Sequence, residues 1–372
     1  MKDLKPKYHQ LLSKVGKSID EWVNNFYRKE IYPKFPEKRV IYEKMLKKKK
    51  GTQKLRGTLT YIIYCSFYGK LVETNKIVPL CTAVELINWA SYELNWLFDE
   101  KAGVINKIER QKTALAMQGF FNDALIILSK YGKEFIDKAV EIYDRILRGF
   151  AAEMKLTIAN KTILHNFHKF WELYKIRNCE AVGQFFGNIV ELVSLFFKNS
   201  KIRDSKSLLK KIFEMAGEYT EILNDLADFV LPREKPLFHE KIIKDWAMDI
   251  RNGTITWPIW LMYNKSDEKD RDFLESLYGK NELCLEEGKK LIKILFETGT
   301  YKEIKRRIRK RYRELKKELR KLQINKKIRG LLQSSLIMLE SNKFYYLLEE
   351  DYGKITLVNK NDKQESKNNN QS

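Results

Sequence analysis

Apolar side chains recur every three or four residues along most of this chain, the spacing that places them on one face of an α-helix. Only 17 glycines and 7 prolines occur in 372 residues, which argues against a fold built from many short strands and tight turns. With 44% hydrophobic residues, the chain can bury a sizeable core. The sequence therefore predicts an all-α protein, with helices over 55–70, 80–98, 111–131, 134–155, 167–198, 204–230, 240–251 and 286–297.

The C-terminal region differs from the rest. The segment 344–358, FYYLLEEDYGKITLV, alternates in a way that predicts a small β-hairpin turning at Asp351–Gly353. From Asn359 onward the chain is polar and lacks aromatic residues, which is typical of a disordered tail. The expected organisation is a helical extension over 1–44, a single main domain over 45–342, and a hairpin with a tail over 343–372.

The chain is strongly basic. Lysine and arginine outnumber aspartate and glutamate by 71 − 49, a net charge of +22, so its surface attracts polyanions. Lys47–Lys50 is expected in a loop, and Tyr301–Lys327 in a long charged helix with a narrow apolar stripe. Because no nucleic-acid-binding motif accompanies these runs, no specific nucleic-acid partner is expected. Peripheral contact with an anionic membrane remains open.

The sequence also favours a cytoplasmic setting. The four cysteines lie far apart, without metal or disulfide spacing, and the first residues carry no apolar leader. The most apolar stretch, Gly183–Phe197, is too short to span a membrane and contains an asparagine and a glutamate.

Two of the predicted helices carry a stripe of carboxylates and amides. In 84–99 the stripe comprises Glu85, Asn88, Ser91 or Tyr92, Asn95 and Asp99; in 217–228 it comprises Glu221, Asn224, Asp225 and Asp228. Such groups are costly to bury unless they are paired or bind an ion, and Mg²⁺ prefers oxygen ligands. The stripes therefore indicate a metal–phosphate site, with two alternatives: a solvated helix face, or an amide network in a bundle core.

The segment 244–258, KDWAMDIRNGTITWP, resembles the sequence GKPxGxDLREGKxTLP of polyprenyl diphosphate synthases. The second lysine of that pattern is Thr254 here. The matching positions are Lys244, Asp249, Arg251, Gly253, Thr256 and Pro258.

Other segments resemble the same family in the same order. GEYTEILNDLAD over 217–228 is similar to its second aspartate motif, GxxxQIxDDxxD, with Glu221 for the glutamine and Asn224 for the first aspartate. TQKLRGTL over 52–59 is similar to its GKRLRPxL, and NDAL over 122–125 to its GDALL. The resemblance covers about residues 45–340.

The first aspartate motif departs from the family pattern ELxHxxSLxxDDxxD. Asn95 and Trp96 replace two of its three aspartates, and only Asp99 remains. The paired arginines that follow are absent, and a later lysine–threonine pair is Arg177-Asn178.

The resemblance implies a class I isoprenoid synthase fold, a helical bundle around a deep apolar cavity, with Mg²⁺ as cofactor. Its substrates would be isopentenyl diphosphate and an allylic prenyl diphosphate. It assigns the metal to Asn95, Asp99, Asn224, Asp225 and Asp228, and Glu221 joins them because it lies one helical turn before Asp225. It further implies diphosphate binding by Lys54, Arg56, Lys244, Asp249 and Arg177, catalysis by Lys244 and Arg56, and a cavity floor at Ala90 and Ser91.

Three functions are compatible with these residues. The first is a prenyltransferase with an atypical or weakened site, whose small floor residues permit a long product. The others are a non-catalytic partner of an active synthase and a terpene-synthase-like enzyme of the same fold. A homodimer, or a heteromer with an active synthase, is expected from the resemblance.

Overall fold

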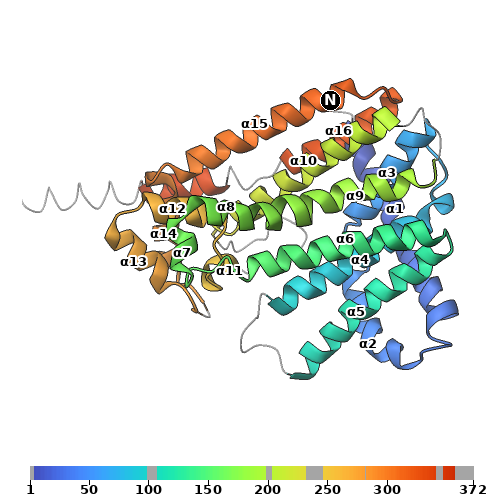
Figure 1. The fold of residues 1–372 in the computed structure, drawn as a ribbon, viewed down its shortest axis with the longest axis horizontal. Helices are drawn as coiled ribbons and strands as arrows, with labels where there is room; N and C mark the ends of the chain where they lie inside the picture. The colour runs from blue at the N-terminus through green and yellow to red at the C-terminus, as the bar shows by residue number, and fades with distance from the viewer. Residues whose placement is uncertain are drawn as a thin grey trace, which may run out of the picture. The chain divides into compact units, whose positions relative to one another are not determined.

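The structure is a computed structural model that describes residues 4–98, 107–197, 203–231, 246–280, 282–340 and 347–356. These residues are mainly helical (Figure 1), and the β-structure among them is one isolated bridge between Thr157 and Thr254. The predicted all-α class is thus confirmed. The α-helices are α1 (Leu4–Phe26), α2 (Glu37–Lys49), α3 (Leu55–Tyr68), α4 (Val78–Phe98), α5 (Lys107–Ser129), α6 (Lys133–Glu153), α7 (Lys161–His165), α8 (Phe167–Lys175), α9 (Gln184–Ser194), α10 (Arg203–Ala227), α11 (Met248–Arg251), α12 (Trp257–Lys265), α13 (Glu268–Ser276), α14 (Leu285–Glu297), α15 (Thr300–Lys321) and α16 (Lys326–Glu340). Shorter 3₁₀ and π segments are η1 (Tyr27–Ile31), η2 (Thr74–Lys76) and η3 (Ile176–Gly183).

The chain forms two compact units that interleave along the sequence. The first unit comprises Met1–Phe150, Cys179–Glu218 and Arg313–Glu340. The second comprises Ala151–Asn178, Tyr219–Tyr312 and Ser341–Ser372. Helices α10 and α15 contribute to both units. The expected boundaries after residues 44 and 342 remain predictions.

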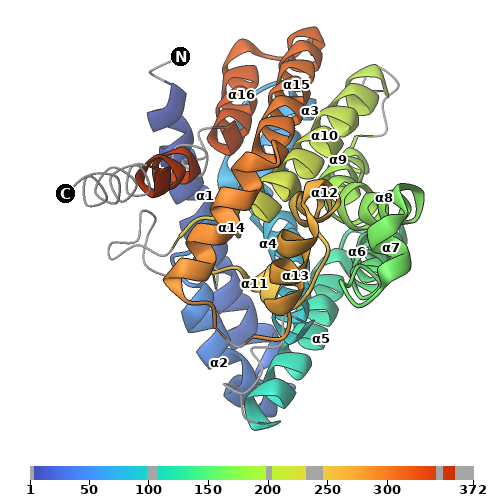
Figure 2. The ribbon, with the colours of Figure 1, turned by 90° about the vertical axis from the view of Figure 1, so that its left-hand side faces the viewer.

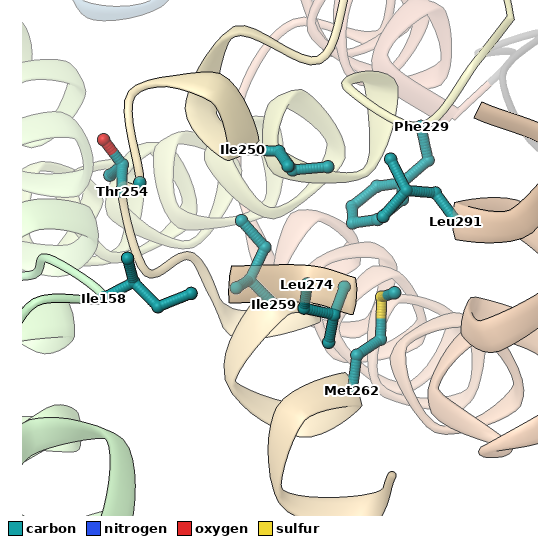
Figure 3. A pocket seen from close by; sticks show the side chains of 9 residues that line it. Ile158, Phe229, Ile250, Thr254, Ile259, Met262, Leu274 and Leu291 are labelled. Carbon is teal, nitrogen blue, oxygen red and sulfur yellow. The ribbon is translucent and has the colours of Figure 1, made fainter. Parts of the chain in front are cut away.

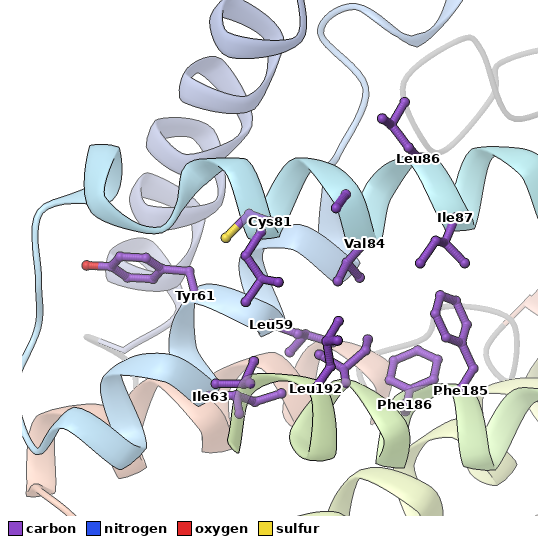
Figure 4. Packing of buried hydrophobic residues seen from close by; sticks show 14 of the residues in the cluster. Leu59, Tyr61, Ile63, Cys81, Val84, Leu86, Ile87, Phe185, Phe186 and Leu192 are labelled. Carbon is purple, nitrogen blue, oxygen red and sulfur yellow. The ribbon is translucent and has the colours of Figure 1, made fainter. Parts of the chain in front are cut away.

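The core of the first unit is built around α4, which contacts α1, α3 and α5. This helix is apolar on nearly every side over its first three turns, so it is buried among its neighbours. Helix α3 packs on both α4 and α9. Figure 4 shows the contact zone, where Leu59 of α3 and Val84 of α4 lie near Phe186 of α9.

In the second unit, short helices pack around aromatic side chains. Helix α7 contacts both α8 and α12 (Figures 1 and 2). Trp257 of α12 meets Trp171 and Tyr174 of α8 edge to face, with centroids 4.9 and 5.7 Å apart. These aromatic contacts hold the helix that leads into η3.

The C-terminal hairpin was predicted wrongly. Residues 347–356 are helical. The apparent alternation is a helical face: Leu347, Leu348 and Asp351 are buried, and Lys354 donates to Glu350 one turn earlier. The rest of the expected hairpin and the tail from Asn359 lie outside the described residues.

The lysine run over 47–50 was also misplaced. Lys47, Lys48 and Lys49 form the last turn of α2. A cation is favourable at this position because the unpaired carbonyls of a helix C-terminus carry partial negative charge.

The charged helix predicted over 301–327 is confirmed as far as Lys321, where α15 ends, and its apolar stripe is buried. Its predicted end at 327 is wrong, because residues 322–325 are not helical and α16 begins at Lys326. The helix predicted over 167–198 is interrupted by the π segment η3, a wide turn of the kind often found at functional sites. No described helix is long and apolar enough to cross a membrane.

Candidate functional site

Glu85 of the first stripe connects α4 to α3 through a buried hydrogen bond. It is 1% exposed, and its Oε1 accepts the backbone N–H of Gly57 at 2.7 Å, in the first turn of α3. Asn88 donates to its other oxygen at 3.3 Å. Burial raises the pKa of Glu85, opposed by the Gly57 N–H and the nearby cations Arg56 and Lys54. The first two polar residues of this stripe thus hold α3 against α4.

Gly57 packs tightly against α1 and α4. A Cβ there would lie 2.5 Å from Ile19 Cδ1 and 3.1 Å from the Cys81 carbonyl oxygen, which belongs to the backbone and cannot turn away. Replacing Gly57 by alanine is expected to lower the free energy of unfolding by about 1–3 kcal/mol. Urea unfolding followed by circular dichroism measures the change.

Gly16→Ala is the matched control for this substitution. Gly16 lies inside α1, and a Cβ there would meet only Lys54 Cγ at an ordinary 3.7 Å. Alanine should therefore stabilise the protein by about 0.5–1 kcal/mol through helix propensity. Equal effects from the two substitutions would contradict the close-packing explanation.

Lys54, an expected diphosphate ligand, is fully buried and bound to the chain itself. Its Nζ lies 3.1 Å from Asp20 Oδ1, 2.6 Å from the Lys49 carbonyl and 3.0 Å from Thr52 Oγ1. An ammonium has three hydrogens, and these oxygens accept them. In this structure Lys54 fastens the α2–α3 connection to α1. The sequence motif gave no sign of Asp20, which lies in α1 outside the matching segments.

Arg56, the second cation of that motif, has different surroundings. Its guanidinium carbon lies 5.2, 5.3 and 5.6 Å from the ring centroids of Phe185, Phe186 and Tyr92. Its Nε is buried and has no hydrogen-bond partner among the described residues. A guanidinium beside aromatic rings suits a ligand with an anionic head and an apolar chain.

The remainder of the first stripe is largely neutral. Ala90 is fully buried, and Ser91 donates to the Asn88 carbonyl at 2.8 Å. Asn95 and Trp96 follow half-buried, whereas Asp99 lies outside the described residues. Glu93, a carboxylate of α4 outside the stripe, lies 3.0 Å from Lys49 Nζ.

The second stripe is organised by a buried arginine. Asp225 of α10 is fully buried; Oδ1 accepts Arg177 Nη1 at 2.9 Å, and Oδ2 accepts the Tyr174 hydroxyl at 2.8 Å. Arg177 also lies 3.3 Å from Glu221 Oε1 and 3.2 Å from Glu153 Oε2. We refer to Arg177, Glu153, Glu221 and Asp225 as the Arg177 cluster.

Electrostatics keep this arginine charged. Burial alone would lower the pKa of Arg177, but Asp225, Glu153 and Glu221 together raise it well above its ordinary value. Burial also raises the pKa values of Asp225 and Glu153, because the interior penalises their ionised forms. Sequence reasoning missed Glu153 and Tyr174, which come from α6 and α8 and belong to no motif.

Asp228 and Asp249 connect α10 to the segment that carries the family resemblance. Asp228 Oδ2 accepts the Asp249 backbone N–H at 2.8 Å, and both side chains are buried. Lys244, at the start of that segment, lies outside the described residues. Figure 3 shows a small apolar pocket lined by Ile250 of this segment and by Ile259, the residue directly after it. The pocket offers packing surface and no charged group.

The described residues do not fit a Mg²⁺ site as they stand. Asn95 and Asn224 are neutral, and the positively charged Arg177 already lies against Asp225 and Glu221 at 2.9 and 3.3 Å. Within the described part of the chain, no group of three or more His, Cys, Asp or Glu side chains is placed to hold a metal ion. The Mg²⁺ assignment therefore stays a prediction from the resemblance.

The helical bundle and its polar stripes define a class I isoprenoid synthase fold. The model of the polyprenyl synthetase family matches residues 41–295, more than half of the chain. The chain belongs to this family. Among proteins with curated functions, none matches the chain in sequence.

Solved structures share this fold at low sequence identity. A decaprenyl diphosphate synthase from Rhodobacter capsulatus has a TM-score of 0.69 and 16% identity, covering 93% of this chain and 99% of its own. A polyprenyl synthase from Caulobacter crescentus CB15, complexed with calcium and isoprenyl diphosphate, has a TM-score of 0.69 and 14% identity. The match covers 90% of this chain and 96% of that synthase. A geranylgeranyl pyrophosphate synthetase from Pyrococcus horikoshii Ot3 has a TM-score of 0.68 and 17% identity. The match covers 90% of this chain and 100% of that synthetase.

Proposed function

We propose that this chain is an isoprenyl diphosphate synthase-like protein that binds prenyl diphosphates and isopentenyl diphosphate but turns them over slowly. The surroundings of Arg56 carry the binding part of this proposal. Its guanidinium donates to the anionic diphosphate, and the rings of Phe185, Phe186 and Tyr92 offer apolar surface to the hydrocarbon.

The slow turnover follows from two features of the stripes. Some of their positions hold neutral residues, and carboxylates of the second stripe are paired with Arg177. Prenyl transfer breaks the bond between an allylic carbon and the diphosphate oxygen, and the diphosphate leaves with the electron pair. Isopentenyl diphosphate supplies the new carbon–carbon bond and then loses a proton. Charge on the leaving diphosphate must be stabilised, and Asn95, Trp96 and Asn224 contribute no carboxylate for this purpose. The expected rate is lower than that of a member with complete motifs by at least about 10²-fold.

Ligand binding tests the role of Arg56. Arg56→Gln is expected to weaken binding of farnesyl diphosphate about 10–100-fold in calorimetry, because one charged hydrogen-bonding group is worth about 1.5–3 kcal/mol. Arg39→Gln removes an arginine that is 66% exposed and should leave the affinity unchanged. Farnesol, which lacks the diphosphate, should bind both variants alike. Equal diphosphate affinity in wild type and Arg56→Gln would contradict the assignment.

Turnover is tested with isopentenyl diphosphate, allylic diphosphates of several lengths and Mg²⁺, followed by phosphatase treatment and product analysis. A slowly formed, elongated prenyl alcohol is expected. Its length should be geranylgeranyl or longer, because Ala90 and Ser91, the proposed cavity floor, have small side chains. An unelongated alcohol or hydrocarbon would instead indicate a terpene-synthase-like reaction, and a product of ten or fifteen carbons would contradict the proposed floor.

A non-catalytic partner subunit is the second candidate, and the Arg177 cluster favours it. A carboxylate stripe held by an internal arginine keeps the fold without serving chemistry. Diphosphate binding without any turnover, together with stimulation of an active synthase on mixing, would select this function. A homodimer or heteromer remains a prediction in both cases.

We further propose that α15 attaches the protein to anionic membrane. Its exposed cations are Lys302, Arg306, Arg309, Lys310, Arg313, Lys317, Arg320 and Lys321. Their spacing of three and four residues forms one stripe along a helix about 30 Å long. The three glutamates of α15 lie half-buried, and two of them are paired with Lys265 and Lys321 at 2.6 and 2.9 Å. Exposed positive charge therefore predominates along α15. A lipid surface is favoured because the substrates and products of this family are themselves lipids.

A further inference from the structure

The Arg177 cluster places one guanidinium among three carboxylates in a buried environment. The three nitrogen–oxygen distances are 2.9 Å to Asp225, 3.2 Å to Glu153 and 3.3 Å to Glu221. Three different nitrogens make these contacts: Nη1, Nε and Nη2. The Asp225 contact is a hydrogen bond, whereas Nε faces Glu153 as an ion pair without a hydrogen bond. The planar guanidinium can face three carboxylates at once, which a lysine ammonium on a flexible stem does less well.

The backbone contributes to this arrangement. Arg177 lies in η3, whose π-type turns displace side chains from ordinary α-helical register. Arg177 Nη1 also donates to the amide oxygen of Asn178 at 3.1 Å, which fixes the orientation of the fork. Tyr174, one turn earlier, donates to the second oxygen of Asp225.

A divalent cation at Asp225 would lie close to the positive charge of the Arg177 guanidinium, which repels it. Each Asp225 oxygen already accepts a hydrogen bond, and the guanidinium holds one oxygen of Glu221 and one of Glu153. Removing a buried arginine from three carboxylates without replacing its charge is strongly unfavourable. The place that a metal would take beside this stripe is filled by a cation of the chain itself.

We propose that Arg177 supplies the positive charge that balances the second carboxylate stripe. The stability of this part of the protein then does not depend on a divalent metal. The inference concerns metal binding, so it holds or fails whether or not the chain turns over prenyl diphosphates. It also gives the unusual Glu221 a role, because its Oε1 lies 3.3 Å from Arg177 Nη2.

The test compares the thermal midpoint and Mg²⁺ or Ca²⁺ titrations of wild type and Arg177→Gln. The wild-type midpoint should not change when either metal is added. Arg177→Gln releases the carboxylates, so its midpoint should fall in metal-free buffer and recover with added metal, with affinity at least tenfold above wild type. Arg148→Gln, which removes an arginine 3.3 Å from Glu180 on the surface, is the control and should respond as wild type does.

Two results would overturn the proposal. One is a folded Arg177→Gln protein that gains no metal affinity. The other is a wild-type protein that binds Mg²⁺ or Ca²⁺ in a manner abolished by Asp225→Asn. The wild-type and Asp225→Asn titrations decide the question even if Arg177→Gln does not fold.

Discussion

Replacing Asp225 by alanine is expected to lower the free energy of unfolding by about 3–5 kcal/mol, the usual cost of removing one partner of a buried ion pair. Asp225 accepts hydrogen bonds from both Arg177 and Tyr174 at full burial. The alanine variant leaves two buried donors without this acceptor and opens a small cavity beside them. Urea unfolding at neutral pH measures the loss.

Asp225→Asn separates the charge of Asp225 from its hydrogen bonds. Burial raises the pKa of Asp225, so the interior already disfavours its charged form. The asparagine oxygen can accept from Arg177 or Tyr174, and its cost should be at most about half that of alanine. Glu275→Gln is a comparison at a less buried site: the Glu275 carboxylate accepts the Tyr263 hydroxyl at 2.6 Å, but its side chain is 37% exposed. A loss below about 1 kcal/mol in Asp225→Ala would show that Asp225 is not the anchor of the cluster.

Local sequence patterns predicted the helices of this fold well where a helix has one distinctly apolar face and one distinctly polar face. The apolar stripe of α15 and the polar stripes of α4 and α10 could all be identified from three- and four-residue spacing. Over 347–356 the helical spacing was mistaken for the alternation of a strand. The pair of leucines followed by a pair of acidic residues resembles one arm of a hairpin. In a segment this short, the tertiary contact between Tyr352 and Phe296, with centroids 4.1 Å apart, outweighs local preference.

The motifs supplied candidate site residues, and their assignment to a site remains a prediction. The motifs gave no information on the partners that each residue takes. Lys54 and Arg56 are separated by one residue, yet one is paired with Asp20 and the other lies among aromatic rings. This difference is set by α1 and α9, which are distant in sequence from the motif. Likewise, Arg177 was expected to meet a substrate diphosphate, whereas here it meets three carboxylates, because Glu153 arrives from the end of α6. Side-chain pairing between distant segments leaves no periodic signal in a single sequence.

Neutralising four exposed cations of α15 is expected to reduce binding to anionic vesicles by about 10³-fold. Each lysine or arginine near an anionic surface contributes about 1 kcal/mol, so four contribute about 4 kcal/mol. The variant carries glutamine at Arg306, Lys310, Arg313 and Lys317, which occupy one face of α15 and are exposed. Co-sedimentation with phosphatidylserine–phosphatidylcholine vesicles measures the partition coefficient.

A second variant with the same loss of charge tests whether the stripe itself matters. It carries glutamine at four exposed lysines on different segments: Lys14, Lys133, Lys155 and Lys269. Long-range attraction falls equally in both variants, but only the α15 variant loses a continuous surface that can lie against lipid headgroups. Wild-type binding should vanish on pure phosphatidylcholine and weaken as salt shortens the screening length to about 3 Å near 1 M.

The outcomes distinguish a membrane from other polyanions. Equal losses in the two variants would show that net charge, and not α15, attracts the vesicles. Vesicle binding that resists salt would contradict an electrostatic attachment. If wild type binds a nucleic-acid duplex through α15 but not the anionic vesicles, the stripe faces nucleic acid instead. Membrane attachment through α15 alone would place a protein that handles prenyl diphosphates at the surface where long prenyl chains partition, because a lengthening hydrocarbon gains about 0.8 kcal/mol for each buried methylene.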